Sequence, residues 1–561
     1  MSPSEDNAAD DQEKQTVSSQ NSNSEDSPRV QEEDNWDGSS SKSCTPRSRV
    51  KCRGPVQPGS PNVFNPEDPR EAGDQTYDHT PIQGWKHLDE IYDLLLAEEE
   101  PTSFRLAKGK REWDQAMASE MASIEKNKTW VLTELPSEHR PIGLKWIFKV
   151  KKNAQGDVIR HKARLVAKGY IQEHGIDYDE VFAPVARMET IRLILALAAQ
   201  KGWAVHHLDV KTAFLHGDLK EDVFVSQPEG FIKTGREHMV YKLSKALYGL
   251  KQAPRAWNLK LNGVLKEYGF RRCKLEQAVY IRHSHKEPLI VGIYVDDLIV
   301  TGRCIEDIKL FKRQMENKFE MSDLGMLSYY LGLEVKHEVD ATEYRDMSKG
   351  LCGEDLETNW DVSMYMHSPR ETHLQAVKHM LRYIKGTTNW GINYKRRGNE
   401  CLIGFSDSSF SVDQDDGKGT TGTVFYYNGG PITWNSQKQP TVALSSCEAE
   451  FMAATSAACQ VVWLRGLLAE ITGKQEEPVL IRVDNKSAIS LMKNPVFHGR
   501  SKHINTRYHY IRECVELEQI KVEHVSGDQQ RADILTKPLP KLRFAEMRQL
   551  LGMEQIEESA T

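Results

Sequence analysis

The chain lacks any run of about 18 consecutive apolar residues, and its first six residues lack the apolar core of a signal peptide. We therefore expect neither a membrane span nor secretion. Its nine cysteines are scattered singly, without a Cys-x-x-Cys pair or a Cys/His cluster of the zinc type. This pattern predicts reduced thiols in the cytosol or nucleus and argues against a disulfide or zinc framework.

The sequence also lacks a bulk excess of positive charge. Its net charge is -7 over 561 residues, of which 28% are charged. A surface that binds nucleic acid must therefore be a local patch rather than a bulk property. A chain of this length is expected to hold three or more domains with sizeable cores.

Aromatic residues are scarce at the start of the chain, where Ser, Asp, Glu, Asn and Pro are abundant up to about residue 80. Such a composition buries too little apolar surface to offset chain entropy, so we expect residues 1–100 to be a disordered, acidic and Ser-rich region. A basic cluster at residues 47–53 either serves nuclear import or is merely solvated, and the sequence leaves both open. Helical periodicity at residues 113–121 predicts the entry helix of a folded unit.

A pair of adjacent acids, Asp296 and Asp297, lies between two apolar, β-branched runs at residues 289–295 and 298–301. These runs predict a strand, a tight turn and a second strand. Burying two neighbouring unpaired aspartates would cost several kcal/mol, so they should sit at the turn, facing solvent or a divalent cation. An isolated Asp-Asp would be an ordinary turn, but the surrounding motifs favour a site.

A second hairpin is predicted upstream, with one packed and one basic face. In residues 145–151 the lysines occupy odd positions, while Trp146, Phe148 and Val150 occupy even ones. Eight Lys or Arg and a single acid, Asp157, fall between positions 145 and 168. A solvated strand face is the simple explanation, but cations concentrated on one face of an acidic chain favour phosphate binding.

A third acid, Asp209, ends the predicted strand at residues 205–210, which follows an apolar core helix at residues 188–199. Further on, residues 248–257 combine a glycine, two cations and two aromatic rings at a loop-to-helix junction. Glycine lets backbone approach a ligand closely, while the cations and rings suit phosphates and bases.

These motifs together resemble one known family. The strings are KARLVAKG (162–169), FAPVAR (182–187), LDVKTAF (208–214), LYGLKQAPRAW (247–257) and YVDD (294–297). In this order, residues 113–337 resemble the reverse transcriptase of copia-type retrotransposons. The resemblance implies a right-hand polymerase with fingers and palm over residues 101–338.

The resemblance also implies roles for individual residues. Asp209, Asp296 and Asp297 would be the catalytic acids and bind two Mg²⁺ ions, because clustered carboxylates are the hard ligands that Mg²⁺ prefers. Lys162, Arg164 and Lys168 would hold the incoming triphosphate. Phe214 would clash with a ribose 2′-hydroxyl, and Gly249 and Lys251 would line the nucleotide and template site.

One region departs from the family. After position 336 most of the expected thumb and connection is missing, and residues 347–361 resemble nothing in it, so residues 339–400 are expected to be a truncated thumb. Since the thumb clamps the duplex, any polymerisation should be weak and distributive.

The C-terminal part shows a second set of acids at the ends or starts of predicted elements. Asp407 and Asp484 end strands, and Asp533 opens a helix. Ser445 and Glu448 fit a capping box at the start of a long helix, which leaves Glu450 as the better catalytic candidate while Glu448 stays open. Each acid alone is an ordinary solvated residue.

Their order, strand-acid, helix-acid, strand-acid, helix-acid, resembles ribonuclease H. Residues 402–539 resemble the copia-type version through TWNSQKQPTVALSS (433–446), VDN (483–485) and ADILTK (532–537). The resemblance implies a ribonuclease H-like mixed-sheet domain over residues 401–545 and a tail over 546–561. Asp407, Glu450, Asp484 and Asp533 would bind two Mg²⁺ ions, and residues 497–503 could contact a hybrid backbone. Ser409 and Phe410 stand where the family usually has an acid and a Trp.

The sequence therefore predicts an α+β and α/β multidomain protein, an RNA-directed DNA polymerase with ribonuclease H. Its partners would be an RNA template, a DNA primer, an RNA:DNA hybrid and dNTPs. The protein would be located in the cytoplasm, within a virus-like particle, or in the nucleus. Two alternatives remain: a decayed copy that only binds nucleic acid, and a copy that keeps only the nuclease. The oligomeric state is not predicted.

Overall fold

The computed structural model describes residues 100–555, apart from 153–156, 285–286, 339–340, 347–370, 388, 397, 399, 412, 414–415, 476, 494–503 and 505. The predictions for residues 1–99, including the basic cluster at 47–53, and for residues 497–503 lie outside the described residues. Residues 347–370 and a few others of the segment 339–400, in which the thumb was expected to be truncated, also lie outside the described residues, whereas residues 341–346 and most of 371–400 are described.

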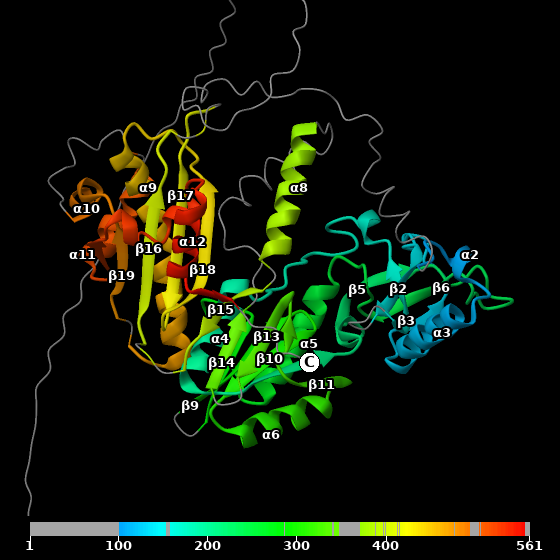
Figure 1. Cartoon of the computed structure of the whole chain (residues 1–561). Helices are drawn as coiled ribbons and strands as arrows, with labels where there is room; N and C mark the ends of the chain where they lie inside the picture. The colour runs from blue at the N-terminus through cyan, green and yellow to red at the C-terminus, as the bar shows by residue number, and fades with distance from the viewer. Residues whose placement is uncertain are drawn as a thin grey trace, which may run out of the picture. The chain divides into compact units, whose positions relative to one another are not determined.

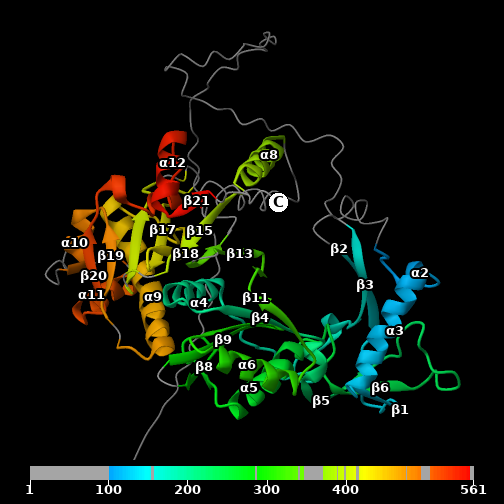
Figure 2. The same cartoon turned by 60° about the horizontal axis from the view of Figure 1, so that its bottom comes forward.

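The first folded part is built on the predicted basic hairpin. Strands β2 (Leu144–Lys152) and β3 (Val158–Ala167) pair antiparallel, and β2 alternates buried and exposed residues as expected. Helix α3 (Arg111–Lys126) covers β3, and its Trp113 meets Phe148 of β2 edge-on with ring centroids 5.2 Å apart. Figures 1 and 2 show α3 beside this hairpin. A three-stranded sheet adjoins it in the order β1 (Trp130–Thr133), β6 (Val240–Lys245), β5 (Asp218–Val225).

The second part is a six-stranded sheet that carries the predicted Asp-Asp hairpin. Its order is β11 (Met321–Met326), β4 (Val205–Val210), β10 (Asp297–Gly302), β9 (Glu287–Tyr294), β8 (Val279–Ser284) and β7 (Arg271–Arg272). Helix α4 (Met188–Lys201) packs in the core on one face, and α5 (Ala253–Glu267) and α6 (Ile305–Glu316) pack on the other. The predicted strand, turn and strand are confirmed.

A third sheet joins the segment after the Asp-Asp hairpin to the C-terminal segment. It has the order β12 (Tyr329–Tyr330), β13 (Leu333–Glu338), β14 (Ala341–Asp346), β15 (Trp390–Tyr394) and β21 (Met553–Gln555). Helix α8 (Glu371–Gly386) precedes β15. The predicted tail over residues 546–561 is therefore wrong in part: the boundary at 545 falls inside helix α12 (Lys541–Leu550), and β21 pairs with β15.

The C-terminal sheet has the order β18 (Gly430–Lys438), β17 (Thr420–Tyr427), β16 (Leu402–Ser408), β19 (Val479–Val483) and β20 (Ile520–His524). The first three strands are antiparallel, whereas β16, β19 and β20 run parallel. Helices α9 (Ser446–Thr472), α10 (Lys486–Lys493) and α11 (Tyr510–Glu516) accompany it. Figure 1 shows this sheet in yellow and orange.

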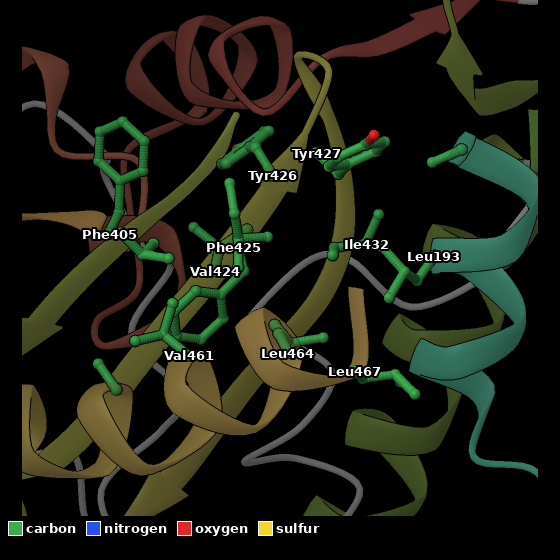
Figure 3. Close-up of a cluster of buried hydrophobic side chains, with 14 of the residues drawn as sticks. Leu193, Phe405, Val424, Phe425, Tyr426, Tyr427, Ile432, Val461, Leu464 and Leu467 are labelled. Carbon is green, nitrogen blue, oxygen red and sulfur yellow. The ribbon is translucent and has the colours of Figure 1, made fainter. Parts of the chain in front are cut away.

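Helix α9 is the core helix of the C-terminal part. By length and composition it could cross a membrane, but 61% of its most apolar window is buried inside the protein. Figure 3 shows Leu464 and Leu467 of α9 near Ile432, with Leu193 of α4 in the same cluster. Burial of this kind explains the apolar composition of α9 without a membrane.

Candidate catalytic sites

The first site is assembled at the turn between β9 and β10. Because β10 pairs antiparallel with β4, Asp297 lies directly opposite Asp209, and Asp296 lies at the turn just before Asp297. The turn residue Val295 has φ +58°, a strained conformation for a β-branched residue. Its carbonyl accepts a 2.7 Å hydrogen bond from Trp257 Nε1, which fixes the turn. On the other side, Val210 N donates to Asp296 O at 2.9 Å.

The three acids form a concentration of negative charge that is half-buried. Burial raises the pKa of Asp209, and the charge of Asp297 raises it further. Burial likewise raises the pKa of Asp296, with the charges of Asp297 and Asp209 adding to the effect. Lys162 opposes the rise at Asp209. A site of this kind favours a bound cation or a retained proton.

Two of the three acids share a cavity with the basic hairpin, and Asp297 is not among the residues that line it. A cavity of about 780 Å³ is lined by Asp209 and Asp296, and by Lys162 and Arg164 of β3. Arg164, one of these lining residues, has its guanidinium 4.3 Å from the ring centroid of Tyr248, so a cation lies at the wall of the cavity. Cations and carboxylates facing one space suit a ligand that carries both phosphates and divalent cations.

The predicted binding residues Phe214, Lys168, Gly249 and Lys251 do not line the cavity. The ring centroid of Phe214 lies 4.7 Å from that of Tyr248. Gly249 has φ +90°, and a Cβ there would lie 2.2 Å from Ala167 O, so its role in this structure is close backbone packing.

Lys251 is engaged elsewhere. Its ammonium donates to Gln172 O at 3.0 Å and to the Tyr178 hydroxyl at 3.3 Å. The aliphatic part of Lys168 lies against Gly143. These two lysines therefore serve local packing in the described structure, and their predicted contacts with a nucleotide or template stay predictions.

Sequence reasoning missed one residue of this site. His207 Nε2 lies 3.0 Å from Asp297 Oδ1. The available signal was its position two residues before Asp209 on the same strand, since strand residues i and i+2 share a face.

The second site joins three carboxylates on the C-terminal sheet. Asp407 lies on β16, Asp484 follows the parallel neighbour β19, and Glu450 lies near the start of α9. One oxygen from each lies within 4.8 Å of the others. Asp407 is 2% exposed and Glu450 is 5% exposed, so two of the three charges are withdrawn from water.

Hydrogen bonds hold these carboxylates in place. Ser408 N donates to Glu450 Oε1 at 3.1 Å, and the Thr536 hydroxyl donates to Asp407 Oδ2. Glu450 Oε2 is buried and accepts no hydrogen bond from the described residues. An all-carboxylate donor set with such an oxygen fits a hard divalent cation such as Mg²⁺.

The raised pKa values of these carboxyl groups also favour a bound cation. Burial raises the pKa of Asp407 to about 6. Burial, followed by the charges of Asp407 and Asp484, raises the pKa of Glu450 to about 9. Burial also raises the pKa of Asp484. Without a cation, the cluster therefore retains a proton near neutral pH.

Glu448 and Glu450, between which the sequence left the choice open, differ in their contacts. Ser445 Oγ accepts a 3.2 Å hydrogen bond from Glu448 N, and Glu448 Oε2 accepts a 2.9 Å hydrogen bond from Leu444 N. Glu448 thus caps α9 as the capping box predicts, with its carboxylate one residue further back than expected. Only Glu450 of the two belongs to the carboxylate cluster.

Asp533 does not belong to this cluster, and it opens a three-residue 3-10 helix (Asp533–Leu535) rather than a longer helix. Its carboxylate is paired with Lys537, although its charge still raises the pKa of Asp407. Ser409 has a structural contact: its hydroxyl accepts a 2.8 Å hydrogen bond from Thr420 N, while Phe410 is exposed.

Comparisons with known proteins show which family the N-terminal folded region is similar to. Residues 127–348 match the family described as reverse transcriptase (RNA-dependent DNA polymerase). The chain is 36% identical over 536 residues to the retrovirus-related Pol polyprotein from transposon TNT 1-94 of Nicotiana tabacum, covering 84% of the chain and 40% of that protein. It is 37% identical over 521 residues to the polyprotein from transposon RE1 of Arabidopsis thaliana, covering 83% and 35%.

A solved structure titled "Structure of the foamy viral protease-reverse transcriptase in complex with RNA/DNA hybrid" matches with a TM-score of 0.35 and 10% identity, covering 86% of this chain and 66% of that one. The chain spans 40% or less of the length of the two plant polyproteins. With its reverse transcriptase region at residues 127–348, the chain belongs to the family of copia-type retrotransposon Pol polyproteins.

Proposed function

We propose that this chain is an RNA-directed DNA polymerase whose C-terminal sheet is a ribonuclease H. The polymerase proposal depends on one observation above others: the antiparallel register of β4 and β10 sets Asp209 opposite Asp297, beside Asp296. The substrates would be an RNA template, a DNA primer and dNTPs. The second activity would act on the RNA strand of an RNA:DNA hybrid.

In nucleotide addition, Asp209, Asp296 and Asp297 would hold the cations. The chemistry that bound Mg²⁺ supplies is activation of the primer hydroxyl and neutralisation of charge on the transferred phosphate. Lys162 and Arg164, which line the same cavity, would bind the triphosphate. Burial and the charge of Arg164 lower the pKa of Lys162, and the negative charge of a bound phosphate would raise it again. The protein's contribution is thus positioning and charge neutralisation.

In hybrid cleavage, Asp407, Glu450 and Asp484 would be the cation ligands. The three oxygens within 4.8 Å and the raised pKa of Glu450 support this assignment. Lys537 pairs with Asp533 through Oδ1. Asp533 is proposed as a fourth cation ligand, which would bind through Oδ2.

Two assays on the full chain test the proposal: primer extension on an RNA template with Mg²⁺, and cleavage of the RNA strand of a hybrid. The matched variants are Asp297→Asn for the first site and Asp484→Asn for the second. We expect Asp297→Asn to abolish extension and leave cleavage, and Asp484→Asn to do the reverse. Extension unaffected by Asp297→Asn would contradict the polymerase assignment.

A second candidate function is nucleic-acid binding without chemistry, through the basic hairpin of β2 and β3. The observation in its favour is the row of exposed lysines on β2, with Lys145 and Lys149 on the face opposite the buried Trp146 and Phe148. Binding of a hybrid with neither extension nor cleavage would select this candidate. Cleavage without extension would select a copy that keeps only the nuclease.

A further inference from the structure

The face of the six-stranded sheet that carries the acids also carries a histidine. In the pairing of β4 with β10, His207 lies opposite Ile299, and Asp209 lies opposite Asp297. Since alternate residues of a strand share a face, His207 is the diagonal neighbour of Asp297. Diagonal neighbours on one face are within reach of a long side chain. The observed separation of Nε2 and Oδ1, 3.0 Å, is that of a hydrogen bond.

The direction of this hydrogen bond follows from chemistry. An ionised carboxylate can only accept, so the proton lies on His207 Nε2 and the imidazole donates. The neutral ring suffices for this, provided that it is the Nε2-H tautomer. One oxygen of Asp297 is thus occupied by the imidazole, and Oδ2 remains for another partner.

The imidazole is itself held in place. His207 is 8% exposed, and its ring meets that of Tyr330 edge-on, with centroids 5.3 Å apart and an interplanar angle of 78°. Tyr330 lies on β12 and is 1% exposed. A ring packed in this way has little freedom to rotate, so the donor is preorganised toward Asp297.

We propose that His207 is a positioning residue of the polymerase site, which orients the carboxylate of Asp297 for a divalent cation. The inference rests on the proposed polymerase function and extends it to a residue that touches neither cation nor substrate. Removing a hydrogen-bond partner that orients a metal ligand typically weakens metal binding by about 10- to 100-fold. We expect a loss of this size when His207 loses its donor.

The test is direct Mn²⁺ binding by the full chain, followed by electron paramagnetic resonance of the free ion. Asp484→Asn serves as the parent, so that the C-terminal carboxylates contribute less to the signal. His207→Leu should weaken Mn²⁺ binding by about 10- to 100-fold. His207→Gln should restore most of it, because the glutamine amide also offers a donor.

The matched control is His206→Leu. His206 points to the opposite face of β4, where its Nδ1 lies 3.0 Å from Lys312 Nζ, and the same substitution there should leave Mn²⁺ affinity unchanged. Thermal melting of each variant checks that the fold is retained. Restoration by glutamine separates orientation from packing, since a merely structural role of the ring would not be rescued by an amide.

Three results would overturn the inference. They are full affinity in His207→Leu, equal losses in His207→Leu and His207→Gln, and an equal loss in His206→Leu. A different result would instead overturn the proposed function, and the inference with it: Mn²⁺ binding in the parent that does not change when Asp297→Asn is added.

Discussion

Replacing Glu450 by glutamine should stabilise the cation-free C-terminal sheet and reduce its response to Mg²⁺. Burial and the charges of Asp407 and Asp484 raise the pKa of Glu450 to about 9 from the ordinary 4.5. A group with a raised pKa contributes stability that is complete below its unfolded pKa and is lost as the pH rises through its folded pKa. At pH 7.5, about three pH units above the ordinary pKa of a glutamate, the free energy of unfolding is therefore about 4 kcal/mol lower than at acidic pH.

Glutamine removes this cost because it never ionises. Its side-chain oxygen can still accept the hydrogen bond that Ser408 N donates to Glu450 Oε1. The expected gain at pH 7.5 in EDTA is therefore up to about 4 kcal/mol, and it should shrink as the pH falls toward 4.5. In the unchanged chain, a cation at one hundred times its Kd would raise the free energy of unfolding by about 2.7 kcal/mol. Most of this increase should be lost in Glu450→Gln, because the variant lacks the Glu450 carboxylate that would bind the cation.

Hydrogen exchange of peptides that cover β16 and β19, corrected for the intrinsic rates, measures the local opening free energy. Glu448→Gln is the matched control, because glutamine also suits a capping box and Glu448 lies outside the carboxylate cluster. The control should match the unchanged chain in EDTA and in Mg²⁺. If Glu450→Gln opens more readily than the unchanged chain in EDTA at pH 7.5, or keeps the full Mg²⁺ response, the reasoning is wrong.

Three further predictions concern local structure. Gly249→Ala should lower the free energy of unfolding by about 2–3 kcal/mol, and Gly109→Ala should lower it by less. Both glycines have positive φ, but of the two only Gly249 has a backbone oxygen where the Cβ would lie. Equal losses of the two variants in urea denaturation would contradict this prediction. Trp257→Phe should cost about 1 kcal/mol and reduce primer extension by up to about 100-fold, since it removes the 2.7 Å hydrogen bond to Val295 O; extension at the normal rate would refute a role for this bond. Ser445→Ala should destabilise α9 by about 1 kcal/mol, as seen in thermal melting, whereas Ser446→Ala, one residue inside the helix, should have little effect.

Local patterns in the sequence predicted the elements that carry both sites. The alternation of lysines with Trp146 and Phe148 predicted the burial of β2, and the apolar runs around Asp296 predicted the hairpin of β9 and β10. Ser445 predicted the start of α9. These features depend on neighbours within a few residues, where side-chain periodicity and capping act directly.

Only the tertiary structure decided which of these residues come into contact. Glu450 rather than Glu448 joins the carboxylate cluster because the capping hydrogen bonds turn Glu448 back toward Leu444. Asp533 pairs with Lys537, and β21 extends the sheet at β15 instead of forming a tail. His207 reaches Asp297 across 90 positions. The Glu448 and Asp533 contacts span only four residues. The carboxylate cluster, the pairing of β21 with β15 and the contact of His207 with Asp297 depend instead on strand register and on packing between segments far apart in the chain, which no local pattern specifies.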